Sequence, residues 1–257
     1  MKHYIFRLTL CALGAWLSVS AHAFTIVIDA GHGGRDAGAI GFISKEKNIN
    51  LSIALELGRL LEANMKDVKV VYTRKTDVFV DLDKRAQIAN KNKADLFISI
   101  HTNSTASGRN GTTVQGTETF TLGMHRAADN LEVAKRENSV ITLENDYEEK
   151  YEGFDPKSSE SYIIFELMQD EYMKQSVLLA DMIQKQFASH AGRINKGVKQ
   201  AGFLVLREVS MPSALIEVGF INNRAEEKFL NTKEGIAKMS RSIYNAIKKY
   251  KEQAKLT

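Results

Sequence analysis

The sequence TIVIDAGHGG, residues 25–34, decides how the fold begins. Its β-branched first half, Thr25 to Asp29, is typical of a buried strand, and the glycines that follow indicate a loop at the carboxyl end of that strand. His32 lies in this loop. Open α/β sheets bind ligands just beyond the carboxyl ends of their strands, so we expect a functional site here.

The segments that follow alternate between strand and helix patterns. Asn48 is expected to cap a helix with apolar residues at helical spacing, and the run from Leu96 to Ile100 predicts a strand that delivers His101. Strands and helices in alternation are the βαβ rhythm of an α/β domain, and no composition shift divides residues 24–257 into two domains. The remaining patterns predict strands at 68–72, 118–122, 203–206 and 214–218, and helices at 81–92, 126–143, 159–187 and 225–250.

The first 23 residues have the pattern of a cleaved secretory signal. Lys2 and Arg7 precede an apolar run at 8–19, and the triplet AHA at 21–23 has the small-x-small form of a signal-peptidase site. The run is too short to span a bilayer comfortably, which disfavours an uncleaved anchor. We expect an exported protein, periplasmic or extracellular, with no membrane anchor after cleavage.

Composition narrows the class of protein further. The 257 residues are 44% apolar and 26% charged, which excludes collagen-like, low-complexity and wholly disordered chains. A net charge of +4 is too small to predict binding to nucleic acid. Cys11, the only cysteine, lies in the signal, so the mature chain cannot form a disulfide. We expect a monomer stabilised by its core.

Four residues carry the chemistry. His32 and His101 follow predicted strands, Glu46 lies at the start of the first helix, and Glu217 interrupts an apolar strand. A buried carboxylate is costly unless it is paired or neutral, so Glu217 is either functional or part of a structural salt bridge. Two histidines and one glutamate form the three-ligand set of a catalytic zinc site, although their separations of 14 and 55 residues are only suggestive.

Four motifs in order resemble the zinc-dependent N-acetylmuramoyl-L-alanine amidases of the amidase-3 family. They are IDAGHGGRDAGAI at 28–40, Glu46-Lys47, SIHTN at 99–103 and LIEVGFIN at 215–222. The resemblance implies a single α/β domain with a mixed, largely parallel sheet flanked by helices on both faces. It also implies cleavage of the amide that joins muramic acid to the peptidoglycan stem peptide.

The resemblance assigns roles residue by residue. It implies that His32, Glu46 and His101 are the ligands of one Zn²⁺ ion and that Glu217 is the catalytic acid/base. Arg85 and Arg207 match recurring positions, and we interpret both as structural or substrate-orienting.

An acidic stretch interrupts the second half of the chain. Residues 129–171 contain 13 acidic and 4 basic residues, whereas the rest of the mature chain is net positive. This is either a solvated acidic helix face or an acidic insert over a cationic site. The resemblance favours the insert, at about 126–170: a regulatory helix that covers the zinc until an activator protein removes it. The candidates for the blocking carboxylate are Glu132, Glu137 and Glu144.

Two other functions stay open on the sequence alone. A zinc peptidase acting within the stem peptide would use the same metal site, and a non-catalytic peptidoglycan-binding protein would keep the fold without the chemistry. The intact set of ligands with Glu217 disfavours the second. His125 and His190 have no motif context, and we expect both at the surface.

Overall fold

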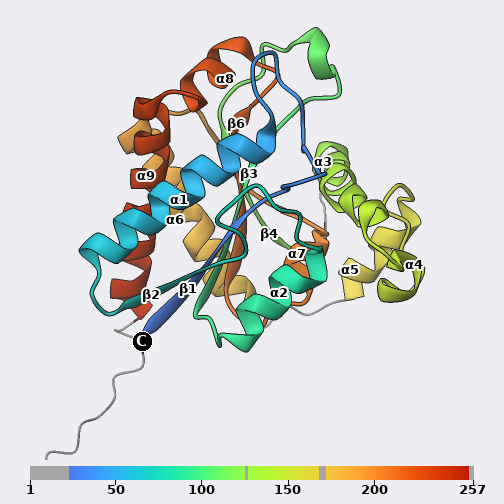
Figure 1. Cartoon of the computed structure of the whole chain (residues 1–257), viewed down its shortest axis with the longest axis horizontal. Helices are drawn as coiled ribbons and strands as arrows, with labels where there is room; N and C mark the ends of the chain where they lie inside the picture. Colours follow the sequence, from blue (N-terminus) through green and yellow to red (C-terminus); the bar gives the residue numbers. More distant parts are fainter. Residues whose placement is uncertain (1–22, 125–126, 168–171, 255–257) are drawn as a thin grey trace, which may run out of the picture.

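The computed structural model describes residues 23–124, 127–167 and 172–254, and it centres on one sheet. The signal predicted at 1–23 lies outside these ranges except for Ala23, as do His125 and a few residues of the insert. The six strands are ordered β2-β1-β3-β6-β4-β5 (Figure 1). They are β1 Phe24–Ala30, β2 Val68–Tyr72, β3 Leu96–Asn103, β4 Thr117–Leu122, β5 Asn195–Ala201 and β6 Ser213–Phe220.

The sheet is mixed and mostly parallel, as expected. β1 pairs in parallel with β2 and β3, and β3 pairs in parallel with β6. β4 runs antiparallel to β6 and parallel to β5. The carboxyl ends of β1, β3 and β6 therefore meet at one edge of the sheet, which brings their loops together.

Helices cover both faces of the sheet. Three long helices pack on one face through a shared apolar cluster: α1 Glu46–Asn64, α6 Met173–Ala191 and α9 Lys233–Ala254. A second apolar cluster on the other face joins α2 Leu82–Lys91, α7 Leu204–Arg207 and the insert. Figure 1 shows the insert as a separate layer beside this second face. Near the end of β6 lies α8 Arg224–Leu230.

The insert is a chain of short helices rather than one long one. They are α3 Ala128–Asn138, η2 Ser139–Leu143, α4 Tyr147–Lys150, η3 Glu160–Ile163 and α5 Ile164–Leu167. A further turn, η1 Gly108–Asn110, lies in the loop after β3. No helix within the described ranges has the length and hydropathy that a membrane crossing requires.

Three predictions about elements need correction. The strand predicted at 203–206 is instead the start of helix α7, which spans Leu204–Arg207 after the N-cap Phe203. The edge strand β5 already pairs with β4, and this apolar run packs in the second apolar cluster. The single helix predicted at 159–187 corresponds to the short helices η3 and α5 over 160–167 and to α6 from Met173, and residues 168–171 between them lie outside the described ranges. Helix α1 begins at Glu46, not after Asn48; its N-cap is Lys45, and Glu46 adds a favourable negative charge in the first turn.

Candidate active site

The loop after β1 holds His32 in a strained conformation. His32 has a φ of 62°, in the left-handed region that side chains seldom adopt and that clusters at functional sites. Gly31 allows the ring of His101 to come close, because a Cβ there would lie 2.3 Å from its Nε2. His32 Nδ1 lies 2.6 Å from Asp36 Oδ2. Since an ionised carboxylate only accepts, Nδ1 carries the proton and Nε2 is turned toward the site.

Glu46 and His101 reach the same point from α1 and β3. Glu46 Oε2 accepts from the backbone N–H of Ala39 at 2.8 Å, and Oε1 accepts from that of Thr102 at 2.9 Å. Asn50, one turn along α1, also donates to Oε1 at 3.2 Å. These donors fix the carboxylate, which is 1% exposed, while the buried strand β3 fixes the His101 ring.

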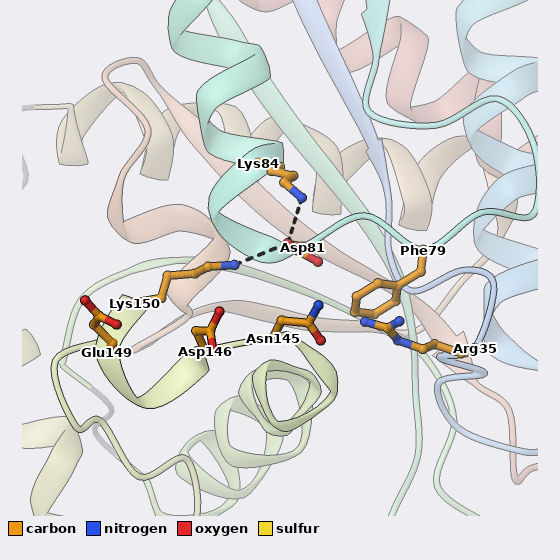
Figure 2. A pocket seen from close by; sticks show the side chains of 8 residues that line it. All are labelled: Arg35, Phe79, Asp81, Lys84, Asn145, Asp146, Glu149 and Lys150. Atoms are coloured by element: carbon orange, nitrogen blue, oxygen red, sulfur yellow. Dashed lines mark hydrogen bonds and ion pairs between the residues drawn. The ribbon is translucent and has the colours of Figure 1, made fainter.

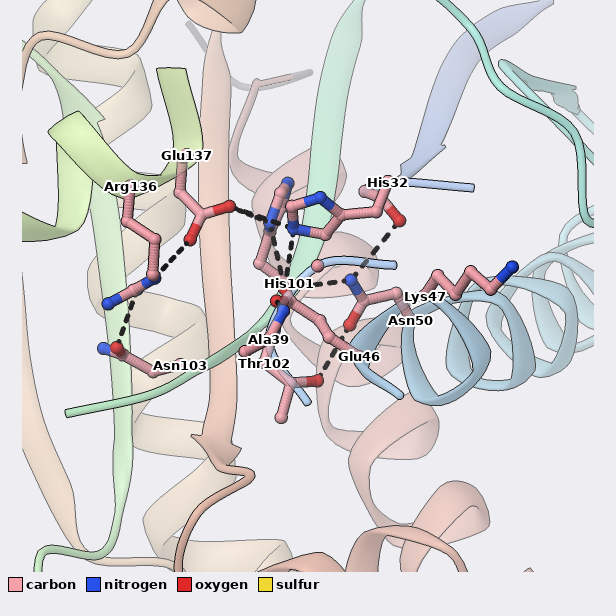
Figure 3. Close-up of polar contacts among 12 residues, drawn as sticks. His32, Ala39, Glu46, Lys47, Asn50, His101, Thr102, Asn103, Arg136 and Glu137 are labelled. Carbon is pink, nitrogen blue, oxygen red and sulfur yellow. Dashed lines mark hydrogen bonds and ion pairs between the residues drawn. The ribbon is translucent and has the colours of Figure 1, made fainter. Parts of the chain in front are cut away.

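A fourth side chain joins them from the insert (Figure 3). Glu137 Oε2 lies 2.9 Å from His101 Nδ1 and 3.1 Å from His32 Nε2. Glu46 Oε1 lies 3.1 Å from His32 Nε2 and 3.2 Å from His101 Nδ1. One ligand atom from each of these four buried residues lies within 4.8 Å of all the others.

The donor set fits a zinc ion. Among the described residues, His32 Nε2, His101 Nδ1 and Glu137 Oε2 are buried without a hydrogen-bond partner. Unpartnered buried nitrogen and oxygen atoms are costly, and imidazole with carboxylate is the ligand chemistry of catalytic zinc. The buried His/Glu cluster is therefore consistent with the zinc site that the sequence resemblance implies.

The carboxylates of Glu46, Asp36 and Glu137 also make the space between the two histidines strongly favourable for positive charge. Burial lowers the pKa of His101, but the charge of Glu137 and contacts with both glutamates outweigh it and raise that pKa to about 9. Burial likewise opposes protonation of His32, yet Glu46, Asp36 and Glu137 raise its pKa well above the ordinary value. A cation bound between these groups would satisfy the same charge balance.

Glu217 lies beside the cluster on β6. It is paired directly with His101 in the β3–β6 register and is 1% exposed. Neither of its carboxylate oxygens has a hydrogen-bond partner among the described residues. Burial, followed by the charge of Glu137, raises the pKa of Glu217 well above its ordinary value. The charges of Arg136 and His101 oppose this rise but do not cancel it. A carboxyl group with a raised pKa can hold a proton more readily than an exposed glutamate, which suits a general acid/base.

Arg85 supports the loop and does not enter the cluster. Its guanidinium donates to Asp29 Oδ1 at 2.7 Å and to the carbonyl oxygen of His32 at 2.9 Å. Arg85 and Asp29 are both almost completely buried. Arg207 lies on α7, where its Nε is 2.6 Å from Glu208 Oε1. Of the two expected arginines, only Arg85 contacts the site's backbone.

The three candidate blocking residues lie in different surroundings. Glu137 enters the cluster, whereas the Glu132 side chain is 70% exposed and contacts Lys135. Glu144 is buried away from the cluster, where Oε1 accepts from the backbone N–H of Leu82 at 2.8 Å and Oε2 accepts from Tyr151 at 2.9 Å. The surface prediction for His190 is confirmed.

Glu144 belongs to a contact between the insert and the start of α2. Lys150 Nζ lies 3.0 Å from Glu144 Oε2 and 3.2 Å from Asp81 Oδ2. A pocket of about 780 Å³ opens at this junction, and Figure 2 shows Lys150 reaching Asp81 across it. The core contributes one wall, including Arg35, and residues 145–150 contribute the other.

Sequence reasoning missed two residues of the site. Arg136 donates through Nε to Glu137 Oε1 at 3.0 Å and lies 3.8 Å from Glu217 Oε1. Asp36 orients His32. Asp36 could have been identified from the sequence, because it lies four residues after a histidine in a glycine-rich loop. For Arg136, the sequence signal is its place next to Glu137.

Comparisons with known proteins agree with the geometry. The family described as N-acetylmuramoyl-L-alanine amidase, Amidase_3, matches residues 26–249. The amidase AmiC of Escherichia coli O6:H1 is 34% identical over 234 residues, covering 88% of this chain but only 52% of its own length. AmiA of Escherichia coli K12 is 33% identical over 228 residues, which cover 88% of this chain and 75% of AmiA.

Solved structures show the same similarity. An N-acetylmuramoyl-L-alanine amidase from Clostridium difficile 630 superimposes with a TM-score of 0.66 at 28% identity, covering 90% of this chain and 98% of that one. The catalytic domain of the amidase CwlV from Paenibacillus polymyxa gives 0.63 at 30% identity, with 89% and 98% covered. Sequence, fold and the buried His/Glu cluster together show that this chain belongs to the Amidase_3 family of N-acetylmuramoyl-L-alanine amidases.

Proposed function

We propose that this chain hydrolyses the amide between N-acetylmuramic acid and L-alanine in peptidoglycan, with one zinc ion. The single observation that carries the proposal is the convergence of His32, Glu46 and His101, whose facing atoms are buried within reach of one another. Membership of the family supplies the substrate class. A catalytic role for Glu217 is supported by its place beside His101 in the register of the sheet.

The roles follow from the positions of the side chains. His32 Nε2, His101 Nδ1 and a Glu46 oxygen would hold the zinc, which supplies Lewis acidity and favours ionisation of water at neutral pH. Glu217 would accept a proton from the attacking water and return it to the departing alanine nitrogen. Asp36 holds the proton on His32 Nδ1, which keeps Nε2 free to act as a ligand.

The products of a peptidoglycan digest test this proposal. Mass spectrometry of purified peptidoglycan incubated with the zinc-loaded protein should show stem peptides with an unblocked N-terminal alanine. These products should disappear on chelation and in Glu217→Gln, but not in Glu62→Gln, which removes an exposed carboxylate from α1. Cuts inside the peptide would indicate a zinc peptidase. Binding without products, even after removal of residues 126–150, would indicate a non-catalytic binding protein.

We further infer that helix α3 keeps the enzyme inactive until a partner displaces it. Glu137 supports this, because its carboxylate takes the place between the two imidazoles where water and substrate would have to enter. A protein activator in the cell envelope would remove the helix during wall remodelling or daughter-cell separation. Deleting residues 126–150 should raise activity, and an unchanged or lower activity of a folded deletion variant would contradict the inference.

Export is the remaining part of the proposal. Cleavage after Ala23 would release residues 24–257 into the periplasm, or outside the cell. N-terminal sequencing of the protein recovered from each fraction tests this, and an intact Met1 in the exported fraction would contradict it.

A further inference from the structure

A bulge in the edge strand β5 brings two lysines to the same side. The β4–β5 register pairs Thr117 with Asn195 but Thr119 with Val198, so β5 contains one extra residue at this point. Side chains three residues apart normally leave opposite faces of a strand, and the extra residue removes that difference. Lys196 and Lys199 accordingly approach one carboxylate, Glu118 Oε1, at 4.0 and 2.7 Å.

Glu118 cannot balance both lysines. It is 3% exposed, and its second oxygen already accepts from Asn103 Nδ2 at 2.9 Å. One carboxylate against two ammonium groups leaves an excess positive charge on the core side. The side chains of Lys196 and Lys199 are 32% and 26% exposed, so both can still reach a ligand.

These groups line a pocket of about 490 Å³ between the core and helix α3. The core side contributes both lysines with Asn103, Thr105 and Phe220. We call this the lysine pocket.

The lysine pocket adjoins the reaction centre. Glu118 is paired with Glu217 across the antiparallel strands β4 and β6. Arg136 lines both the lysine pocket and the cavity that contains His32 and Glu46, so its side chain forms the wall between them. Its guanidinium bonds to Asn103 Oδ1 at 2.9 Å. Once α3 leaves, the two cavities would join into one groove that passes over Glu217.

Helix α3 presents carboxylates to the lysine pocket. Asp129 and Glu132 line it from the insert side, and Lys196 and Lys199 line it from the core side. When the helix moves away, these acidic groups leave together with Arg136, and the excess positive charge of the core side stays behind. The closed form thus contains acidic groups where the open form would offer a site for an anion.

We propose that the lysine pocket is the subsite for a free carboxylate of the stem peptide, received by Lys196 and Lys199. This inference rests on the proposed amidase function. A peptide carboxylate within a few bonds of the cleaved amide matches the charge of the pocket, and the pairing of Glu118 with Glu217 places the pocket next to the reaction centre. An uncharged sugar would not use two lysines. In the structure, Asp129 and Glu132 of α3 line the same pocket.

Two soluble muramoyl peptides test the proposal. They differ only in whether the α-carboxylate of the second residue is free or amidated, and the readout is the ratio of their kcat/KM values. This ratio does not depend on the fraction of enzyme that is open. A preference of about tenfold for the free carboxylate is expected from one charged hydrogen bond, expressed mainly in KM.

Lys196→Gln should bring the ratio to about one, and Lys199→Gln should lower it as well. Lys238→Gln, which removes an exposed lysine of α9 that pairs with Glu234, should keep the wild-type ratio. Calorimetry of both peptides on the inactive Glu217→Gln protein gives a second readout, with the same expected ratio in Kd.

A ratio near one in the wild type, or a ratio unchanged in Lys196→Gln, would overturn the subsite while leaving the amidase function intact. Absence of products from both peptides, with normal folding and after removal of residues 126–150, would overturn the amidase function and the subsite with it.

Discussion

Replacing Glu137 by glutamine should release the blocked site. The carboxylate is 5% exposed and has three charged contacts: His101 at 2.9 Å, His32 at 3.1 Å and Arg136 at 3.0 Å. Glutamine keeps the size of the side chain but removes the negative charge that faces these groups. The hydrogen bond that Arg136 donates to Glu137 Oε1 joins two charged groups. Such a bond contributes about 1.5–3 kcal/mol, so the closed form should lose about 2 kcal/mol when the charge is removed. That corresponds to about a 30-fold higher open fraction.

The assay is the release of soluble peptide from purified peptidoglycan by the full chain without any partner protein. Glu137→Gln should raise the rate toward that of the variant lacking residues 126–150, which sets the upper limit. Glu148→Gln is the matched control, because it removes an exposed carboxylate from the same insert. Equal rates for the two variants, or a lower rate for Glu137→Gln in a folded protein, would refute the role of Glu137.

Three more predictions follow from buried carboxylates. Glu217→Gln should lower kcat by about 10²–10⁴-fold. It should leave the midpoint of urea unfolding unchanged or higher, because neither carboxylate oxygen of Glu217 has a hydrogen-bond partner among the described residues. A lower midpoint would contradict this. Arg85→Met should cost about 3–5 kcal/mol in urea unfolding, since it leaves buried Asp29 unpaired. Burial raises the pKa of Asp29, but Arg85 and two hydroxyl groups outweigh burial and lower that pKa overall. The ionised Asp29 therefore stabilises the fold above the unfolded pKa of about 3.9, and this stabilisation is lost as pH falls through the folded pKa. The difference in unfolding free energy between wild type and Arg85→Met should accordingly shrink in acid. Glu144→Ala removes the acceptor for the backbone N–H of Leu82, so it should loosen the insert from α2 and raise basal activity. Lys84→Met, which changes an exposed side chain of α2, should not raise basal activity. Similar rates for the two variants would contradict the idea that Glu144 holds the insert against α2.

The structure places acidic residues of the insert next to the core of the protein. The acidic insert contributes Glu137 to the histidine cluster and Asp129 with Glu132 to the lysine pocket. These carboxylates lie beside the imidazole rings of the site and in the pocket that the two lysines line. Of the two interpretations of the acidic stretch, the insert over a cationic site is the one that these contacts favour.

The sequence by itself was enough to identify the candidate zinc ligands and the candidate catalytic acid. A β-branched run that ends in glycines places His32 at a strand end, and an apolar strand does the same for His101, because the carboxyl ends of parallel strands meet at one edge of a sheet. The acid Glu217 stands out within its apolar strand for the same local reason: a buried charge needs a cause. These signals are local in the chain, so they could be recognised without the fold.

Only the tertiary structure decided what depends on packing across the chain. Strand β5 is polar and has no apolar alternation, since it lies at the edge of the sheet, and its bulge exists only relative to β4. The face of α3 that turns inward is set by its apolar contacts with the core, and this selects Glu137 over Glu132. Glu144 lies just beyond the same helical segment, yet it ends as a buried acceptor at α2. Spacing along the chain fixes the angle between side chains of one helix, but the neighbour that each one meets is a property of the folded molecule.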